Sequence, residues 1–99
     1  MKFLLFLSAD CTNLDEAVSA LKKGGHEVGL LLIQDGVYLL DKGCPEARHL
    51  KGLSIPIYAS EHHVEERGIK ARLITDAKLV DYSAMVDLMM EKYDKVISM

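Results

Sequence analysis

The sequence predicts an α/β fold in which one mostly parallel sheet of about five strands carries helices on both faces, as in Rossmann-like and flavodoxin-like domains. Two observations predict this fold. Short apolar runs alternate with helical segments along the chain, and glycine or proline stands between most neighbouring segments. The chain has 99 residues, 49% of them hydrophobic, which suits one domain over residues 1–99 whose core needs no metal or disulfide.

Each expected strand is a short apolar run. The continuous runs from Phe3 to Leu7 and from Val28 to Ile33 are typical of strands that are buried on both faces. Pro56 lacks a backbone donor and should therefore lie at the start of the third strand or at an irregular point in it. The expected strands are 3–7, 28–33, 55–59, 78–80 and, as a strand or a tail, 95–99.

The segments between these strands show helical patterns. Asn13 is the expected N-cap of the first helix, Glu16 stands three positions later as in a capping box, and Gly24-Gly25 ends the helix. Further helical segments are expected from residue 37 to before residue 43, over 46–51, and over 61–67, where Gly68 ends the helix.

The last helix is expected after Asp81, which serves as its N-cap. Met85, Leu88 and Met89 recur there at helical spacing. Met85, Met89 and Met90 are expected to belong mainly to the core, and an adaptable protein contact is the alternative.

Candidate site residues follow the expected strands. In open α/β sheets ligands bind beyond the carboxyl ends of the strands, which selects the loops 8–13, 34–36 and 60–63. The alternative for Gln34-Asp35-Gly36 is a plain turn, in which Asp35 caps the next helix and Gly36 supplies flexibility. With Tyr38 and the helix after the third strand added, the predicted ligand- or partner-binding residues are Gln34, Asp35, Gly36, Tyr38, Ser60, Glu61 and His62.

The chain has two cysteines, which do not form a CxxC motif. Cys11 lies just before an expected helix N-terminus, where a thiolate is stabilised, so it is a candidate sulfur carrier or redox sensor. The alternative is a loop cysteine without a role. Cys44 precedes Pro45, and nothing adjacent to it in sequence would activate its sulfur.

Metal and nucleotide cofactors are not expected. His62 and His63 are adjacent, so on a helix they would point about 100° apart and share one ion poorly. His63 is expected to be a solvated or capping side chain. The sequence has neither a G-x-G-x-x-G nor a Walker motif.

The net charge of −3, from 12 basic and 15 acidic residues, argues against direct nucleic-acid binding. No segment approaches the apolar length of a membrane span. Lys2 and the apolar run after it imitate a short secretion signal, with Cys11 as a lipid-attachment residue. The run is too short, however, and Asp10 stands where a small residue is needed, so a cytoplasmic location is expected.

Three blocks of the sequence resemble the DsrH/TusB branch of the sulfur-relay family. They are "LLLIQDGVYLL" from Leu30 to Leu40, "IYASEHHVEERGI" from Ile57 to Ile69, and "KLVDYSAMVDLMMEKYDKVISM" from Lys78 to Met99. The blocks occur in the family's order and spacing, and the residues before Val28 match in layout only.

The resemblance implies a Rossmann-like subunit of a cytoplasmic sulfur-relay complex with DsrE/TusD-like and DsrF/TusC-like partners. Such a complex passes sulfur towards 2-thiolation of the tRNA wobble uridine, or works in sulfur oxidation. In the catalytic relatives a cysteine precedes an "RRG"-type segment, and anchoring on Glu66-Arg67-Gly68 puts Ser60 at about that position. A serine hydroxyl cannot carry a transferable sulfur as a thiolate does.

Three functions are therefore open. The first is an accessory, non-catalytic subunit of a sulfur-transfer complex. The second is a self-contained persulfide carrier that uses Cys11. The third is a homo-oligomeric binding or scaffold protein without sulfur chemistry.

Overall fold

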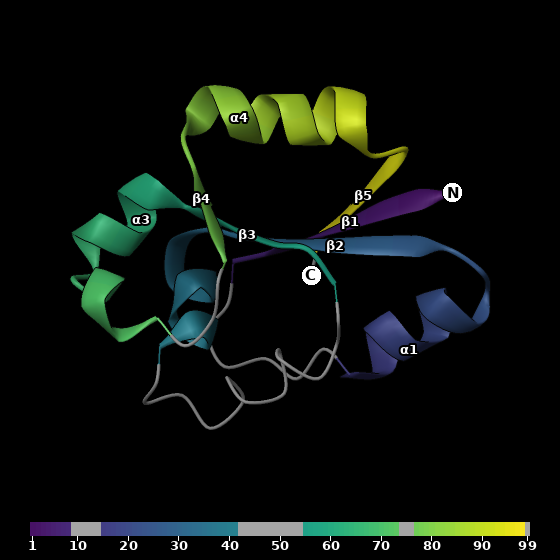
Figure 1. Ribbon diagram of the computed structural model, residues 1–99, viewed down its shortest axis with the longest axis horizontal. Coiled ribbons are helices and arrows are strands. Elements are labelled where there is room, and N and C mark those ends of the chain that lie inside the picture. The colour runs from purple at the N-terminus through teal and green to yellow at the C-terminus, as the bar shows by residue number, and fades with distance from the viewer. Residues whose placement is uncertain (9–14, 42–54, 74–76, 99) are drawn as a thin grey trace.

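A computed structural model describes residues 1–8, 15–41, 55–73 and 77–98, which form an all-parallel five-stranded sheet with helices on both faces (Figure 1). The strand order is β4-β3-β2-β1-β5. The strands are β1 (Lys2–Leu7), β2 (Glu27–Leu32), β3 (Ile57–Ser60), β4 (Lys78–Val80) and β5 (Lys95–Ser98). The predicted α/β class is confirmed, and every expected strand is present within two residues of its predicted bounds.

The helical elements cover the two faces of the sheet unequally. In Figure 1, α4 and the helical turn that continues it lie over one face, whereas α1 and the 3₁₀ helix η1 lie on the opposite side. The elements are α1 (Asp15–Lys23), η1 (Gln34–Leu40), α3 (Glu61–Glu66), η2 (Lys70–Arg72), α4 (Tyr82–Asp87) and a π-helical turn η3 (Leu88–Lys92). The predicted cap at Asn13 and the predicted helix over 46–51 lie outside the described residues, as do Cys11 and Cys44.

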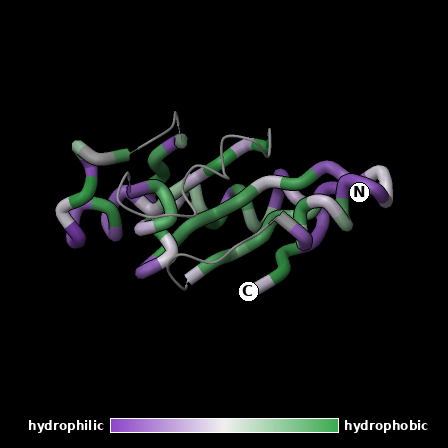
Figure 2. The backbone as a smooth tube through the Cα atoms, turned by 90° about the horizontal axis from the view of Figure 1, so that it is seen from below, coloured by the Kyte–Doolittle hydropathy of each residue, from purple (hydrophilic) through white to green (hydrophobic). Residues whose placement is uncertain are grey.

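The strands divide their side chains between two apolar layers because successive residues of a strand point to opposite faces. Leu4 and Leu31 pack with Val80 and Leu88 under α4. The alternate positions, such as Leu30, pack against α1 and η1 in the larger cluster. Figure 2 shows long hydrophobic stretches through the middle of the molecule and hydrophilic residues mostly at its periphery.

Two helices end at glycines, as the sequence predicted. Gly25 has a φ of 79°, and the amide of His26 donates to the carbonyl of Leu21 at 3.2 Å, as in a Schellman motif. Gly68 has a φ of 65° and ends α3 in the same way. These two turns send the chain back towards the sheet.

The segment after β2 differs from its prediction. The helix begins at Gln34, three residues earlier than expected, and Gln34 itself has a φ of 47°. Asp35 does not cap this helix, because the N-cap position is occupied by Ile33, whose own side chain makes no capping hydrogen bond. Gly36 is needed for a close approach and not for a positive φ, since an added Cβ would collide with the carbonyl group of Leu7.

Candidate functional site at the carboxyl edge of the sheet

A groove of about 590 Å³ opens at the carboxyl edge of the sheet, between α3 and α4. We call it the carboxyl-edge groove. The residues that line it are Phe6, Ile33, Ser60, Glu61, His62, His63, Glu65, Asp81, Tyr82, Met85, Val86 and Met89. The location agrees with the rule that open α/β sheets bind partners beyond the carboxyl ends of their strands.

Four strands each contribute one residue near their carboxyl end to this groove. Phe6 lies near the end of β1, Ile33 follows β2, Ser60 ends β3, and Asp81 follows β4. In the parallel register Leu31 pairs with both Phe6 and Tyr58, and Ser60 pairs with Val80. Because side chains alternate along a strand, this register places Phe6, Ile33 and Ser60 on the face that α4 covers.

Ser60 lies at the junction of β3 and α3 and is only 1% exposed. It is the N-cap of α3, and its hydroxyl oxygen accepts a hydrogen bond from the backbone amide of His63 at 3.4 Å. The side chain predicted to replace the family's cysteine therefore has a structural partner. It is an alcohol that serves as a helix cap at the edge of the groove.

The opposite wall of the groove is formed by α4 and the start of η3. The side chain of Asp81 caps this helix by accepting from the amide of Ala84 at 2.8 Å, as predicted. Met85 and Met89 are half-buried against the core, which confirms their predicted role. Met90 instead is 77% exposed.

A polar network joins η1 to α3 beside the groove. The amide of Gln34 donates to Nδ1 of His63 at 2.9 Å, so His63 accepts at Nδ1 and serves as a cap for the first amide of η1. Arg67 pairs with Asp35, with Nη2 at 3.0 Å and Nε at 3.1 Å from Oδ1. The same guanidinium lies 5.9 Å from the ring centroid of Tyr38.

The predicted site residues therefore fall into two groups. Ser60, Glu61 and His62 line the groove. Gln34, Asp35 and Tyr38 form the supporting network with α3, and Gly36 is buried against the end of β1. Their role in binding stays a prediction.

Sequence reasoning missed the contribution of α4 to the site. Tyr82 and Val86 line the groove and are 78% and 38% exposed. The only sequence signal for them is their position beside Met85 and Met89, whose helical spacing mainly predicts core residues. Arg67 was missed as well, because its partner Asp35 is 32 residues away in sequence.

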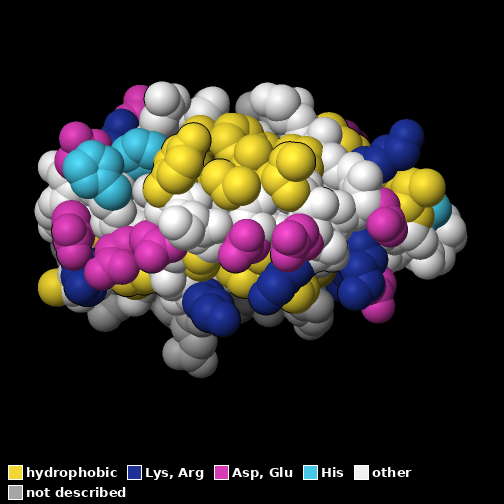
Figure 3. Space-filling model, turned by 90° about the horizontal axis from the view of Figure 1, so that it is seen from above, with side chains coloured by type: hydrophobic (Ala, Val, Ile, Leu, Met, Phe, Trp, Pro, Cys, Tyr) yellow, Lys and Arg dark blue, Asp and Glu magenta, His cyan; other side chains and the backbone are white. Residues whose placement is uncertain are grey.

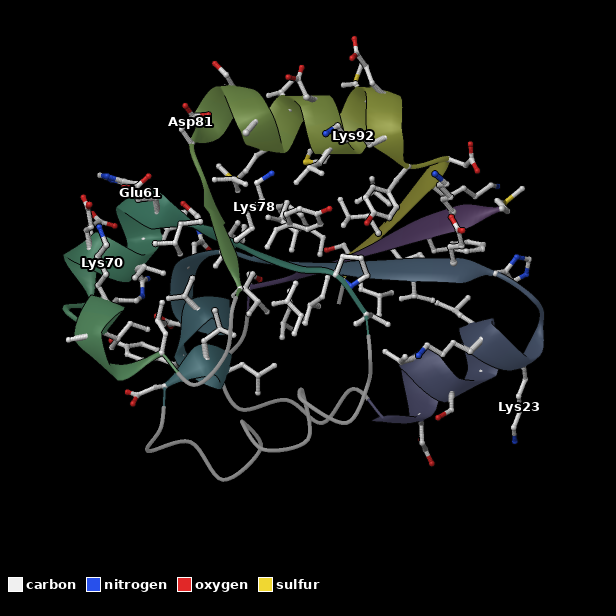
Figure 4. All side chains as sticks on the ribbon, in the orientation of Figure 1. Lys23, Glu61, Lys70, Lys78, Asp81 and Lys92 are labelled. Carbon is white, nitrogen blue, oxygen red and sulfur yellow. The ribbon has the colours of Figure 1, made fainter. Side chains whose placement is uncertain are left out.

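The groove combines an apolar floor with an acidic rim. Glu61, Glu65 and Asp81 line it, and among the described residues that line it there is no lysine or arginine. Figure 4 shows Glu61 and Asp81 at the same end of the molecule, where α3 and α4 begin, whereas Lys92 lies at the far end of the upper helix. The lining of the groove therefore presents carboxylates next to apolar surface, and Lys70, which Figure 4 shows at the same end of the molecule, lies outside that lining.

A second cavity of about 620 Å³ lies at the opposite, amino edge of the sheet and has mixed charges. Lys2 and Glu27 form an exposed ion pair there at 3.6 Å. Burial raises the pKa of the Tyr93 hydroxyl well above its usual value, and a hydrogen bond with Tyr58 and the negative charge of Glu27 add to the effect. Nδ1 of His26 is buried and finds no hydrogen-bond partner among the residues that the structure describes.

Within the described part of the chain, no three His, Cys, Asp or Glu side chains gather as a potential metal site. Nor does any described helix have the length and apolar character that crossing a membrane requires.

The fold and the groove define a class of small, all-parallel α/β proteins with an open site at the carboxyl edge of the sheet. Residues 8–96 match the family model of DsrH-like proteins, so the chain belongs to the DsrH-like family and is a sulfur-relay-related protein. No curated protein matches this chain.

Solved structures of other proteins share the fold, among them the following two. One is the crystal structure of the YchN protein from E. coli. Its sequence is 15% identical to this chain, the superposition covers 100% of both chains, and the TM-score is 0.76. The structure of MTH1491, a protein of unknown function from Methanobacterium thermoautotrophicum, is 13% identical, covers 99% of this chain and 98% of its own, and has a TM-score of 0.74. At these identities the similarity shows the fold alone.

Proposed function

We propose that this chain is an accessory, non-carrier subunit of a cytoplasmic sulfur-relay complex that supports 2-thiolation of the tRNA wobble uridine or a related sulfur transfer. Its partners are DsrE/TusD-like and DsrF/TusC-like subunits, and one of those chains carries the persulfide. Membership of the DsrH-like family supports the sulfur-relay context.

The observation that carries the proposal is Ser60. Sulfur transfer through a persulfide needs a thiolate that attacks and then releases a sulfane sulfur, and a serine hydroxyl remains protonated at neutral pH and forms no such adduct. Ser60 is also 1% exposed and engaged as the cap of α3. Both its chemistry and its burial speak against a carrier role at this position.

The composition supports an indirect role in tRNA thiolation. A chain with a net charge of −3 has no basic excess with which to neutralise phosphates. A partner subunit therefore makes the contacts with tRNA, and this chain contributes protein surface. The carboxyl-edge groove, which lies at the binding edge of the sheet, is the surface we assign to that role.

Co-purification tests the proposal. The tagged chain is isolated from cells that encode DsrE-like and DsrF-like proteins, and the complex is incubated with a cysteine desulfurase and cysteine. We expect intact-protein mass spectrometry to find the sulfur adduct on a partner and not on this chain. Purification without such partners would contradict the accessory role, and an adduct on Cys11 at the level of the partner's adduct would favour a self-contained carrier.

A further inference from the structure

We propose that the carboxyl-edge groove docks an apolar segment of a partner protein that is flanked by lysine or arginine residues. The inference rests on the proposed function in that the chain works within a protein assembly, and it adds the chemistry of the contact. Three features of the groove carry it: an apolar floor, apolar surface that extends beyond the floor, and an acidic rim.

The floor of the groove is made of flexible and aromatic apolar side chains. Phe6 and Ile33 come from the sheet, and Met85 and Met89 come from α4 and η3. Methionine is unbranched and polarizable, so it adapts to the shape of an inserted side chain. Such a floor accepts apolar side chains of several shapes.

The apolar surface continues outside the groove, which favours a protein segment over a small molecule. Tyr82 and Val86 are four residues apart and so lie on one side of α4, next to the groove. Beyond them Met90 is 77% exposed. Figure 3 shows this surface as a broad hydrophobic patch with histidines at one end. A small ligand that filled the groove would leave this outer surface in water, whereas a peptide segment would cover both.

The acidic rim of the groove favours a docked segment that carries positively charged residues. Glu61, Glu65 and Asp81 line the groove. Figure 3 shows acidic side chains along one side of the hydrophobic patch. Carboxylates that surround an apolar floor complement a segment whose apolar side chains lie between cations.

The lysine that already pairs with Glu61 and Glu65 leaves both carboxylates available to a partner protein. Lys70 is paired with Glu61 at 3.8 Å and with Glu65 at 3.7 Å, and all three side chains are between 44% and 56% exposed. Exposed pairs at such distances contribute little to stability, so a partner's lysine or arginine can replace Lys70 at small cost.

The experiment uses the full chain and three fluorescein-labelled peptides of equal length. The first has a Leu-Phe-Leu centre flanked by lysines. The second replaces the lysines with glutamates, and the third replaces the apolar centre with serines. We expect only the first to bind in fluorescence polarisation, with an affinity that falls as salt is added. In the ¹³C-methyl spectrum the signals of Met85 and Met89 should shift, and that of Met1, which lies outside the groove, should not.

Two double variants with the same change in net charge separate the site from bulk electrostatics. Glu61→Gln/Glu65→Gln removes two rim carboxylates, and Glu16→Gln/Glu27→Gln removes two carboxylates that lie away from the docking surface, on α1 and at the amino edge of the sheet. We expect the first to weaken binding by about 2- to 30-fold, as the loss of two exposed charge pairs implies, and the second to leave it unchanged. Val86→Ser should also weaken binding, because it removes exposed apolar surface at the groove.

Several outcomes would overturn the proposal: no binding of the lysine-flanked peptide at millimolar concentration, equal binding of the serine-centred peptide, or equal weakening by the two double variants. A dimer of this chain that Val86→Ser disrupts in sedimentation would mean that a second copy occupies the groove, which also overturns it. These results are independent of thiolation in cells, so failure of the docking proposal and failure of the proposed function are distinguishable.

Discussion

Replacing Gly36 with alanine tests why the segment after β2 has its shape. Gly36 is buried in η1, and an added Cβ would collide with the carbonyl oxygen of Leu7 and lie 2.9 Å from its carbonyl carbon and 3.4 Å from Cα of Ser8. Carbon atoms normally approach to about 3.5–4.0 Å, so η1 would have to move away from β1 by about 1 Å. The obstacle is backbone, which no rotamer change can relieve.

The expected size of the effect follows from two opposing contributions. Gly36 lies outside the left-handed region, so alanine there would by itself stabilise the fold by about 0.4–1 kcal/mol. Overpacking against backbone costs about 1–3 kcal/mol, and the upper end applies because the contact is rigid. We expect a net loss of about 2 kcal/mol, which corresponds to a fall in Tm of roughly 8–16 °C for a domain of this size.

Urea denaturation followed by circular dichroism measures this change. Gly25→Ala is the matched control, because nothing lies within 4 Å of its added Cβ and only its φ of 79° opposes the substitution. We expect that control to lose about 1 kcal/mol from backbone strain alone. A Gly36→Ala protein within about 0.5 kcal/mol of the wild type, inside the range of ordinary surface substitutions, would refute the close-approach explanation.

Three further predictions concern stability. The raised pKa of Tyr93 means that the folded state holds the proton of this hydroxyl more tightly than the unfolded state does. The neutral hydroxyl therefore contributes to the stability of the fold below a pH of about 10, and this stabilisation is lost as the pH rises further. Tm measured between pH 9 and pH 11 should thus fall less steeply in Tyr93→Phe, which also lacks the hydrogen bond with Tyr58, and equal slopes would contradict the assignment. Asp81→Ala should lose about 1 kcal/mol in urea denaturation through the missing cap of α4, while Asp81→Asn should retain most of the stability. His63→Ala should lose about 0.5–1 kcal/mol and should speed hydrogen exchange at the amide of Gln34, and unchanged exchange there would argue against this hydrogen bond.

Local patterns in the sequence were sufficient to predict most of the scaffold. The apolar runs at 3–7 and 28–33 became β1 and β2, and the glycines at 24–25 and 68 ended α1 and α3. Asp81 caps α4 as expected. These features depend on short-range physics: side-chain burial, φ preferences and hydrogen bonds between residues a few positions apart.

The arrangement of the site was harder to predict because it depends on contacts between distant segments. Asp35 is a residue type that often caps helices, but its carboxylate pairs instead with Arg67, the C-cap residue of α3. Gly36 was expected to supply flexibility to a turn, whereas in the structure Gln34 adopts the positive φ and Gly36 makes room for the end of β1. Helical spacing showed that α4 has an apolar side, but it did not show that part of this side stays exposed as Val86 does.

The non-carrier role is tested most directly with a chain that contains no sulfhydryl group. Cys11 and Cys44 are the only cysteines in the sequence, so Cys11→Ser/Cys44→Ser removes every thiol at once. The measurement is the 2-thiouridine content of tRNA, by mass spectrometry, in a deletion strain that expresses this variant at the wild-type level. We expect the variant to restore the modification as fully as the natural chain does. A folded variant that leaves the tRNA unmodified, in a strain that the natural chain rescues, would show that this protein carries the sulfur itself.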